Sequence, residues 1–80
     1  MIYRFFSFFI ITSPSPLLKV NFDGALFMDT SHAGISVVIR DLAGKVIGAL
    51  SERIALPTTV DDVEALACRR AIEFAMEKDL

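Results

Sequence analysis

The stretch that decides the fold is KVNFDGA, residues 19–25. Apolar and polar side chains alternate along it, and Asp23 falls on the polar side together with Asn21. This two-residue period is typical of a β-strand that buries one face. Aspartate is disfavoured in strands, so a strand that contains one usually has a use for its carboxylate. We therefore predict a strand over residues 17–27, with Asp23 as its candidate functional residue.

Two more strands are predicted after this one. Residues 34–41 are rich in β-branched side chains, and residues 45–54 follow a tight turn at residues 42–45. Gly44 can supply the positive φ angle that such a turn uses. Gly48, inside the third strand, indicates a bulge or a close approach of another backbone or side chain. Together the three segments predict an antiparallel meander.

A helix is predicted from Asp61 to about Lys78. Asp61 is a good N-cap residue, and Glu64 three positions later completes a capping-box pattern. At ~100° per residue, Glu64 also falls on the face that should pack against the sheet, where an unpaired acid is costly. Two interpretations stay open: Glu64 reaches back to the Asp61 N–H, or it serves a functional site. The residues that share its face are Val60, Ala67, Cys68, Ala71 and Ala75.

The N-terminal segment differs from the rest of the chain. Residues 5–11 form an apolar run that is too short to span a bilayer, which takes about 20 residues. Arg4 ahead of this run resembles the start of a signal peptide, but the prolines of residues 13–16 follow instead of a small-residue cleavage pattern. We interpret residues 1–16 as a disordered or spurious leader and linker, and residues 17–80 as the domain. A signal or anchor is the less favoured alternative.

Composition narrows the function classes. The 80 residues allow one small domain, and eight basic against ten acidic residues give a net charge of −2. An acidic chain needs local basic groups if it is to bind nucleic acid. Cys68 is the single cysteine, which excludes an intrachain disulfide and a zinc cluster from within the chain, and we interpret it as an apolar core residue. His32 is the single histidine and is expected to be solvated in a loop.

Asp23 and Glu64 are the candidate site residues. One lies on a strand and the other on the first turn of a helix that packs on the same sheet, so their carboxylates could converge. Two neighbouring carboxylates repel and favour a cation between them. Oxygen ligands select a hard ion such as Mg²⁺ or Mn²⁺. Two-metal phosphoryl chemistry needs three or four carboxylates, and only these two are positioned to meet.

These motifs carry a family resemblance. Together with Pro14 and Pro16 ahead of Lys19, they resemble the plant ribonuclease H type 1 domain, an RNase H-like, reverse-transcriptase-associated domain, over residues 14–80. No single sequence block would be enough to indicate the family, but several blocks occur in the expected order. The blocks are KVNFDGA at 19–25, AGISVVIRD at 33–41, GKVI at 44–47, VEALA at 63–67 and AIEFA at 71–75.

The resemblance implies an α/β, RNase H-like fold, truncated here to three antiparallel strands plus the first helix. It implies two-metal hydrolysis of the RNA strand of RNA–DNA hybrids, with Mg²⁺ or Mn²⁺ as the cofactor. The family's first acid, in its N-[FLV]-D-G-A strand, matches Asp23. Its second, in the A-E-A-x-A helix start, matches Glu64, with Val63 in place of the usual alanine. The third and fourth acids of the family follow this helix and lie past Leu80, so half of the metal ligands are expected to be missing.

Whether the chain is by itself an enzyme therefore stays open. The main alternative is a non-catalytic, degenerate nucleic-acid-binding or interaction module of retroelement origin. A weaker third hypothesis is a short secreted or membrane-associated peptide led by residues 1–12. We expect a nuclear or cytoplasmic protein rather than a secreted one, a nucleic-acid partner, no small-molecule cofactor and no membrane association.

Overall fold

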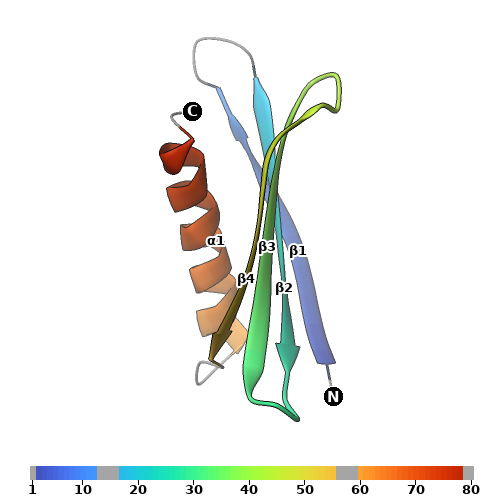
Figure 1. The fold of residues 1–80 in the computed structure, drawn as a ribbon, viewed down its shortest axis with the longest axis vertical. Coiled ribbons are helices and arrows are strands. Elements are labelled where there is room, and N and C mark those ends of the chain that lie inside the picture. Colours follow the sequence, from blue (N-terminus) through green and yellow to red (C-terminus); the bar gives the residue numbers. More distant parts are fainter. Residues whose placement is uncertain (1, 13–16, 56–59, 79–80) are drawn as a thin grey trace.

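Four strands and one helix make up the described part of the chain, which comprises residues 2–12, 17–55 and 60–78 of a computed structural model. The strands pair antiparallel in the order β1-β2-β3-β4, and α1 lies across one face of the sheet (Figure 1). We call the face against α1 the inward face and the opposite one the outward face. The elements are β1 (Ile2–Ile11), β2 (Leu18–Phe27), β3 (His32–Asp41), β4 (Val46–Ala55) and α1 (Val60–Glu77).

The core lies between α1 and the two central strands, β2 and β3. Val20, Val37 and Ile39 are fully buried on the inward face of the sheet. On the helix, Ala67 and Ala71 are fully buried against them. Alanines have short side chains, so they let the helix approach the sheet closely. In β2, the alternation that predicted the strand separates side chains in this core from side chains on the outward face.

The N-terminal segment corrects two expectations, because residues 2–11 form strand β1 instead of a disordered leader and the sheet has four strands instead of three. β1 pairs with β2 along its whole length, from Ile2 opposite Phe27 to Ile11 opposite Leu18. Phe9 packs on the core, and its ring centre lies 6.1 Å from that of Phe22. This pairing satisfies the edge of β2 that would otherwise expose its backbone hydrogen-bonding groups. No helix in the described part is long and apolar enough to cross a membrane.

The turn and bulge predicted from glycines are both present. Gly44 has a φ of +86°, and the turn before it is held by the Asp41 carboxylate, which accepts hydrogen bonds from the Ala43 and Lys45 N–H groups, both 2.9 Å long. The β3–β4 register shifts next to Gly48, where β4 carries one extra residue. A Cβ at Gly48 would lie 3.3 Å from the ring of Phe74, so the close approach predicted there comes from α1.

The start of the helix differs from the prediction. The helix begins at Val60, so Asp61 lies inside its first turn and not at the N-cap. The residues before Val60 fall outside the described part of the chain. The buried face of α1 centres on Val63, Ala67 and Phe74, which places Glu64 at its margin and not at its middle. Phe74 widens the buried face on the side away from Glu64.

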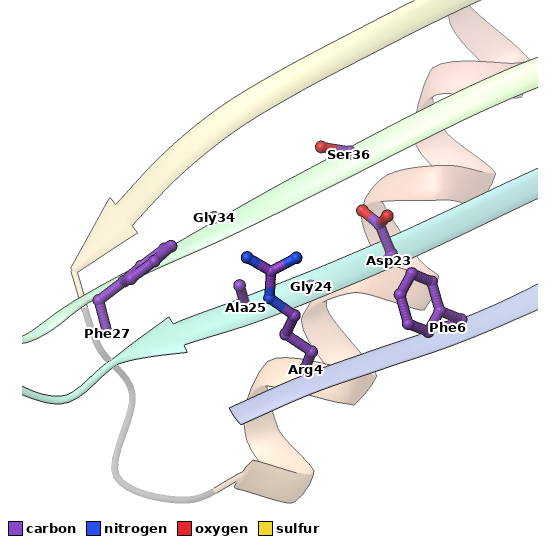
Figure 2. A pocket seen from close by; sticks show the side chains of 8 residues that line it. All are labelled: Arg4, Phe6, Asp23, Gly24, Ala25, Phe27, Gly34 and Ser36. Carbon is purple, nitrogen blue, oxygen red and sulfur yellow. The ribbon is translucent and has the colours of Figure 1, made fainter. Parts of the chain in front are cut away.

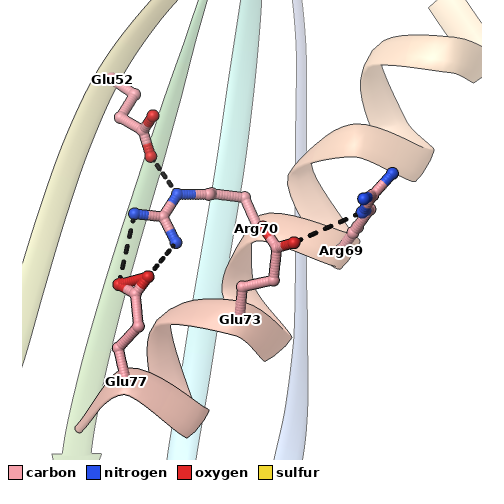
Figure 3. Close-up of polar contacts among 5 residues, drawn as sticks. All are labelled: Glu52, Arg69, Arg70, Glu73 and Glu77. Carbon is pink, nitrogen blue, oxygen red and sulfur yellow. Dashed lines mark hydrogen bonds and ion pairs between the residues drawn. The ribbon is translucent and has the colours of Figure 1, made fainter.

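Arg70 ties α1 to strand β4 (Figure 3). Its guanidinium donates to the carboxylates of Glu52 on β4 and Glu77 on α1, the latter at 3.1 Å. These contacts raise the pKa of Arg70, with the hydrogen bond to Glu52 as the main cause. The surface pair expected between Arg69 and Glu73 is also present, at 3.4 Å. On the helix side, Arg70 thus pairs with Glu52 and Glu77, and Arg69 pairs with Glu73.

Candidate functional site

Asp23 lies in the middle of β2, on the outward face of the sheet. The register places it between Phe6 of β1 and Ser36 of β3. Its neighbour Phe22 faces the core and is only 7 % exposed. Figure 2 views the sheet from the outward side, with Asp23 in front of β2 and α1 behind the sheet. The sheet therefore separates the carboxylate of Asp23 from the helix.

A shallow pocket of ≈ 230 Å³ opens beside Asp23. It gathers a carboxylate, a guanidinium and a hydroxyl, and Figure 2 shows the side chain of Arg4 reaching over β2 between two phenylalanines. A guanidinium binds anionic oxygens well, and an exposed ring offers a flat apolar face. The pocket therefore suits a ligand that has both an anionic group and a flat ring. Its lining residues are Arg4, Phe6, Asp23, Gly24, Ala25, Phe27, Gly34 and Ser36.

Glu64 has a different partner from the one predicted. The hydroxyl of Tyr3 on β1 donates a hydrogen bond of 2.9 Å to its Oε1. This contact replaces the capping-box bond to Asp61 as the described interaction of the carboxylate. The hydrogen bond is also the main cause that raises the pKa of Tyr3 above its ordinary value of 10.0. Glu64 thus links the N-terminal part of α1 to strand β1.

The structure does not bring Asp23 and Glu64 together. Asp23 is on the outward face, whereas Glu64 belongs to the helix on the inward face, and the ring of Phe5 lies between the helix and Gly24. A Cβ added at Gly24 would meet this ring, so Phe5 occupies the space beside the glycine.

Carboxylates suit Mg²⁺ and Mn²⁺, so the donor chemistry agrees with a metal site. The geometry does not, because the described residues contain no group of three or more His, Cys, Asp or Glu side chains able to hold a metal ion. As arranged here, Asp23 and Glu64 do not fit a shared metal centre. Their roles as metal ligands remain predictions.

Comparison with known protein families shows to which family the chain belongs. Residues 21–80 match the family model described as Reverse transcriptase-like, which is an RNase H-like domain. The chain belongs to this family. The match spans both Asp23 and Glu64, and it confirms the reverse-transcriptase-associated, RNase H-like kinship predicted from the motifs. Plant origin and the type 1 assignment remain predictions. No curated protein and no solved structure matches the chain.

The candidate site of this Reverse transcriptase-like domain, the pocket beside Asp23, includes residues that the sequence patterns did not indicate. Arg4 and Phe6 belong to the segment that was interpreted as a disordered leader, ahead of the region that matches the family. Their segment is apolar on both faces, so no two-residue alternation marks it as a strand. Lys19 and Arg40 were also missed, although their even spacing from Asp23 and Ser36 within predicted strands places them on the same outward face.

His32 lies on the outward face as well. Arg53 of β4 donates a hydrogen bond of 3.2 Å to its Nδ1, so that nitrogen acts as an acceptor. His32 is therefore held at the start of β3 by an arginine and is not simply solvated in a loop. Cys68 is free and half-buried, and it packs against the core as expected for an apolar residue.

Proposed function

We propose that this chain is the nucleic-acid-binding first part of an RNase H-like domain, and that RNA–DNA hybrids are its substrate class. The observation that carries the proposal is the family match over residues 21–80. The pocket beside Asp23 supports it, because Arg4 supplies a cation that can meet the phosphate backbone on the outward face. Net charge alone would have argued against a polyanionic partner.

Binding is tested by fluorescence anisotropy with a labelled RNA–DNA hybrid and with a DNA duplex of the same sequence. We expect the hybrid to bind more tightly than the DNA duplex, and Arg4→Ala to weaken hybrid binding. Arg69→Ala is the matched control, because Arg69 is an exposed arginine on the helix side. Equal binding of both duplexes would contradict hybrid preference, and no binding of either would contradict the proposal as a whole.

Metal-dependent hydrolysis of the RNA strand is the second candidate function. It is favoured by the identity of the two acids, since Asp23 and Glu64 both lie in the region that matches the family. It would require Glu64 to leave Tyr3 and approach Asp23, and it would require further carboxylates. The described arrangement does not meet these requirements, so hydrolysis is the weaker of the two candidates.

Hydrolysis is tested by following cleavage of end-labelled RNA in a hybrid with Mg²⁺ present. If the chain is a hydrolase, Asp23→Asn abolishes cleavage, whereas Glu73→Gln on the exposed side of α1 leaves it unchanged. Cleavage that survives Asp23→Asn would show a contaminating nuclease or a different site. If wild-type protein binds the hybrid but does not cleave it, the chain is a binding module.

A further inference from the structure

The strands segregate charge between the two faces of the sheet. All four basic residues of the described strands occupy outward register positions, and of the three acidic residues in these strands only Asp23 does so. The outward face therefore carries an excess of three positive charges on a chain whose net charge is −2. The four basic residues are Arg4, Lys19, Arg40 and Arg53.

Two of these cations lie directly opposite one another. Lys19 of β2 pairs in register with Arg40 of β3. Like charges at a directly opposed position destabilise a sheet, so folding alone does not favour this pair. Within the described part of the chain, neither side chain forms a salt bridge. A polyanion bound across the pair would remove the repulsion.

Exposed aromatic rings lie among the cations. Phe6 is 75 % exposed, Phe8 is 55 % exposed and Phe27 is 37 % exposed. All three occupy outward positions, and the Lys19 ammonium lies 4.4 Å from the centre of the Phe8 ring. Rings that alternate with cations on one surface are the combination that binds unpaired nucleic-acid strands, because bases stack on the rings while phosphates meet the cations.

The outward face is also hollowed along a continuous path. The pocket beside Asp23 shares Phe6 and Ser36 with a second hollow that extends to Arg40. It shares Phe27 with a third hollow that extends to Arg53. The three adjoining hollows together extend from Arg40 to Arg53 and pass the exposed rings of Phe6 and Phe27.

We propose that the outward face of the sheet is a platform for a single-stranded nucleic acid, in which cations hold the phosphates and Phe6 and Phe27 stack bases. This goes beyond the proposed recognition of hybrids, because it requires neither a duplex nor a metal. A duplex keeps the faces of its bases stacked on each other, so it would leave these rings unused. A second copy of this chain would bring like charges together across the face.

The test is fluorescence anisotropy of the full chain with fluorescein-labelled dT12, in EDTA and at several salt concentrations. Wild-type protein binds the oligonucleotide with an affinity that falls as salt rises. Phe6→Ala weakens binding at least about fivefold, since each stacked base contributes about 1–3 kcal/mol. Met76→Ala is the matched control, because Met76 is an exposed apolar residue on the helix, and it leaves binding unchanged.

Two charge variants sharpen the test. Lys19→Ala weakens binding and lowers the salt dependence, whereas Arg69→Ala on α1 changes neither. Asp23→Asn removes the acid from the face and tightens binding of dT12, although the same change would abolish a metal-dependent activity. The two proposals are therefore tested separately. A chain that does not cleave the hybrid can still bind dT12, and a chain that does not bind dT12 can still recognise the hybrid.

Three results would overturn the platform. The first is an absence of dT12 binding at low salt. The second is an equal effect of Phe6→Ala and Met76→Ala. The third is a stable dimer in sedimentation that does not bind the oligonucleotide, which would show that a second copy covers the face.

Discussion

A hydrogen bond from Tyr3 occupies Glu64, one of the two predicted site residues. The sequence left two interpretations of Glu64 open, a helix cap or a functional acid. The structure shows a third arrangement, in which the Tyr3 hydroxyl donates to the Glu64 carboxylate. Tyr3 lies 61 residues away in the chain, so no local pattern could have indicated this contact.

The Tyr3–Glu64 contact predicts a pH dependence. The hydrogen bond raises the pKa of Tyr3 above 10.0, so the bond is fully present below the ordinary tyrosine pKa and is lost as pH rises through the higher, folded-state value. Because Tyr3 is the single tyrosine and tryptophan is absent, tyrosinate absorbance reports it alone. We expect Glu64→Gln to lower the titration midpoint. An unchanged midpoint in that variant would show that the contact does not form in solution.

At Gly24, replacement of glycine by alanine is expected to destabilise the fold, although the same change stabilises most strand interiors. In an ordinary strand interior, alanine is more stable than glycine by roughly 0.5–1 kcal/mol. At Gly24 a Cβ would overlap the Phe5 ring, so the ring must shift and lose packing. We expect Gly24→Ala to destabilise the chain by about 1 kcal/mol in urea denaturation. In a Phe5→Ala background the same change should stabilise; destabilisation in both backgrounds would disprove the contact.

At the scale of elements, the strands and helix downstream of residue 17 were predictable and β1 was not. Period-two alternation marks β2 and β3 because each has one buried and one outward face. The glycines of the β3–β4 hairpin likewise predicted its turn and its bulge. β1 instead carries phenylalanines on both faces, so residues 5–11 read as an apolar run that only Ser7 interrupts. Its partner, the edge of β2, is a tertiary feature that no local pattern shows.

A matched pair of substitutions tests whether β1 is part of the fold. Phe9 faces the core and packs on Phe22, whereas Phe8 points outward and is 55 % exposed. We expect Phe9→Ala to cost about 2 kcal/mol of unfolding free energy, because the side chain is only partly buried. Phe8→Ala should cost less than about 1 kcal/mol, mostly through its lost contact with Lys19. If neither change lowers the unfolding free energy measurably, residues 2–11 are a disordered leader and not part of the fold.

For the whole molecule, the main consequence is that the two predicted site residues fall on opposite sides of the sheet. The sequence pattern correctly placed Asp23 on the polar side of a strand and Glu64 on a helix, and the family match includes both. The sequence pattern could not show that β1 pairs with the free edge of β2. The outward face is basic, because the basic residues of the strands lie on it around Asp23. The overall acidic balance hides this charge segregation.

Alanine methyl groups lie on both faces of the sheet and on the helix, so they report where nucleic acid binds to the molecule. Ala25 and Ala49 lie on the outward face, Ala33 and Ala71 are buried in the core, and Ala65 is exposed on α1. We propose titration of the chain, carrying labelled alanine methyls, with dT12 in the absence of metal. If the outward face binds the oligonucleotide, the Ala25 and Ala49 methyl resonances shift, while those of Ala33, Ala71 and Ala65 stay in place. A shift confined to Ala65, or no shift at all, would contradict binding at this face.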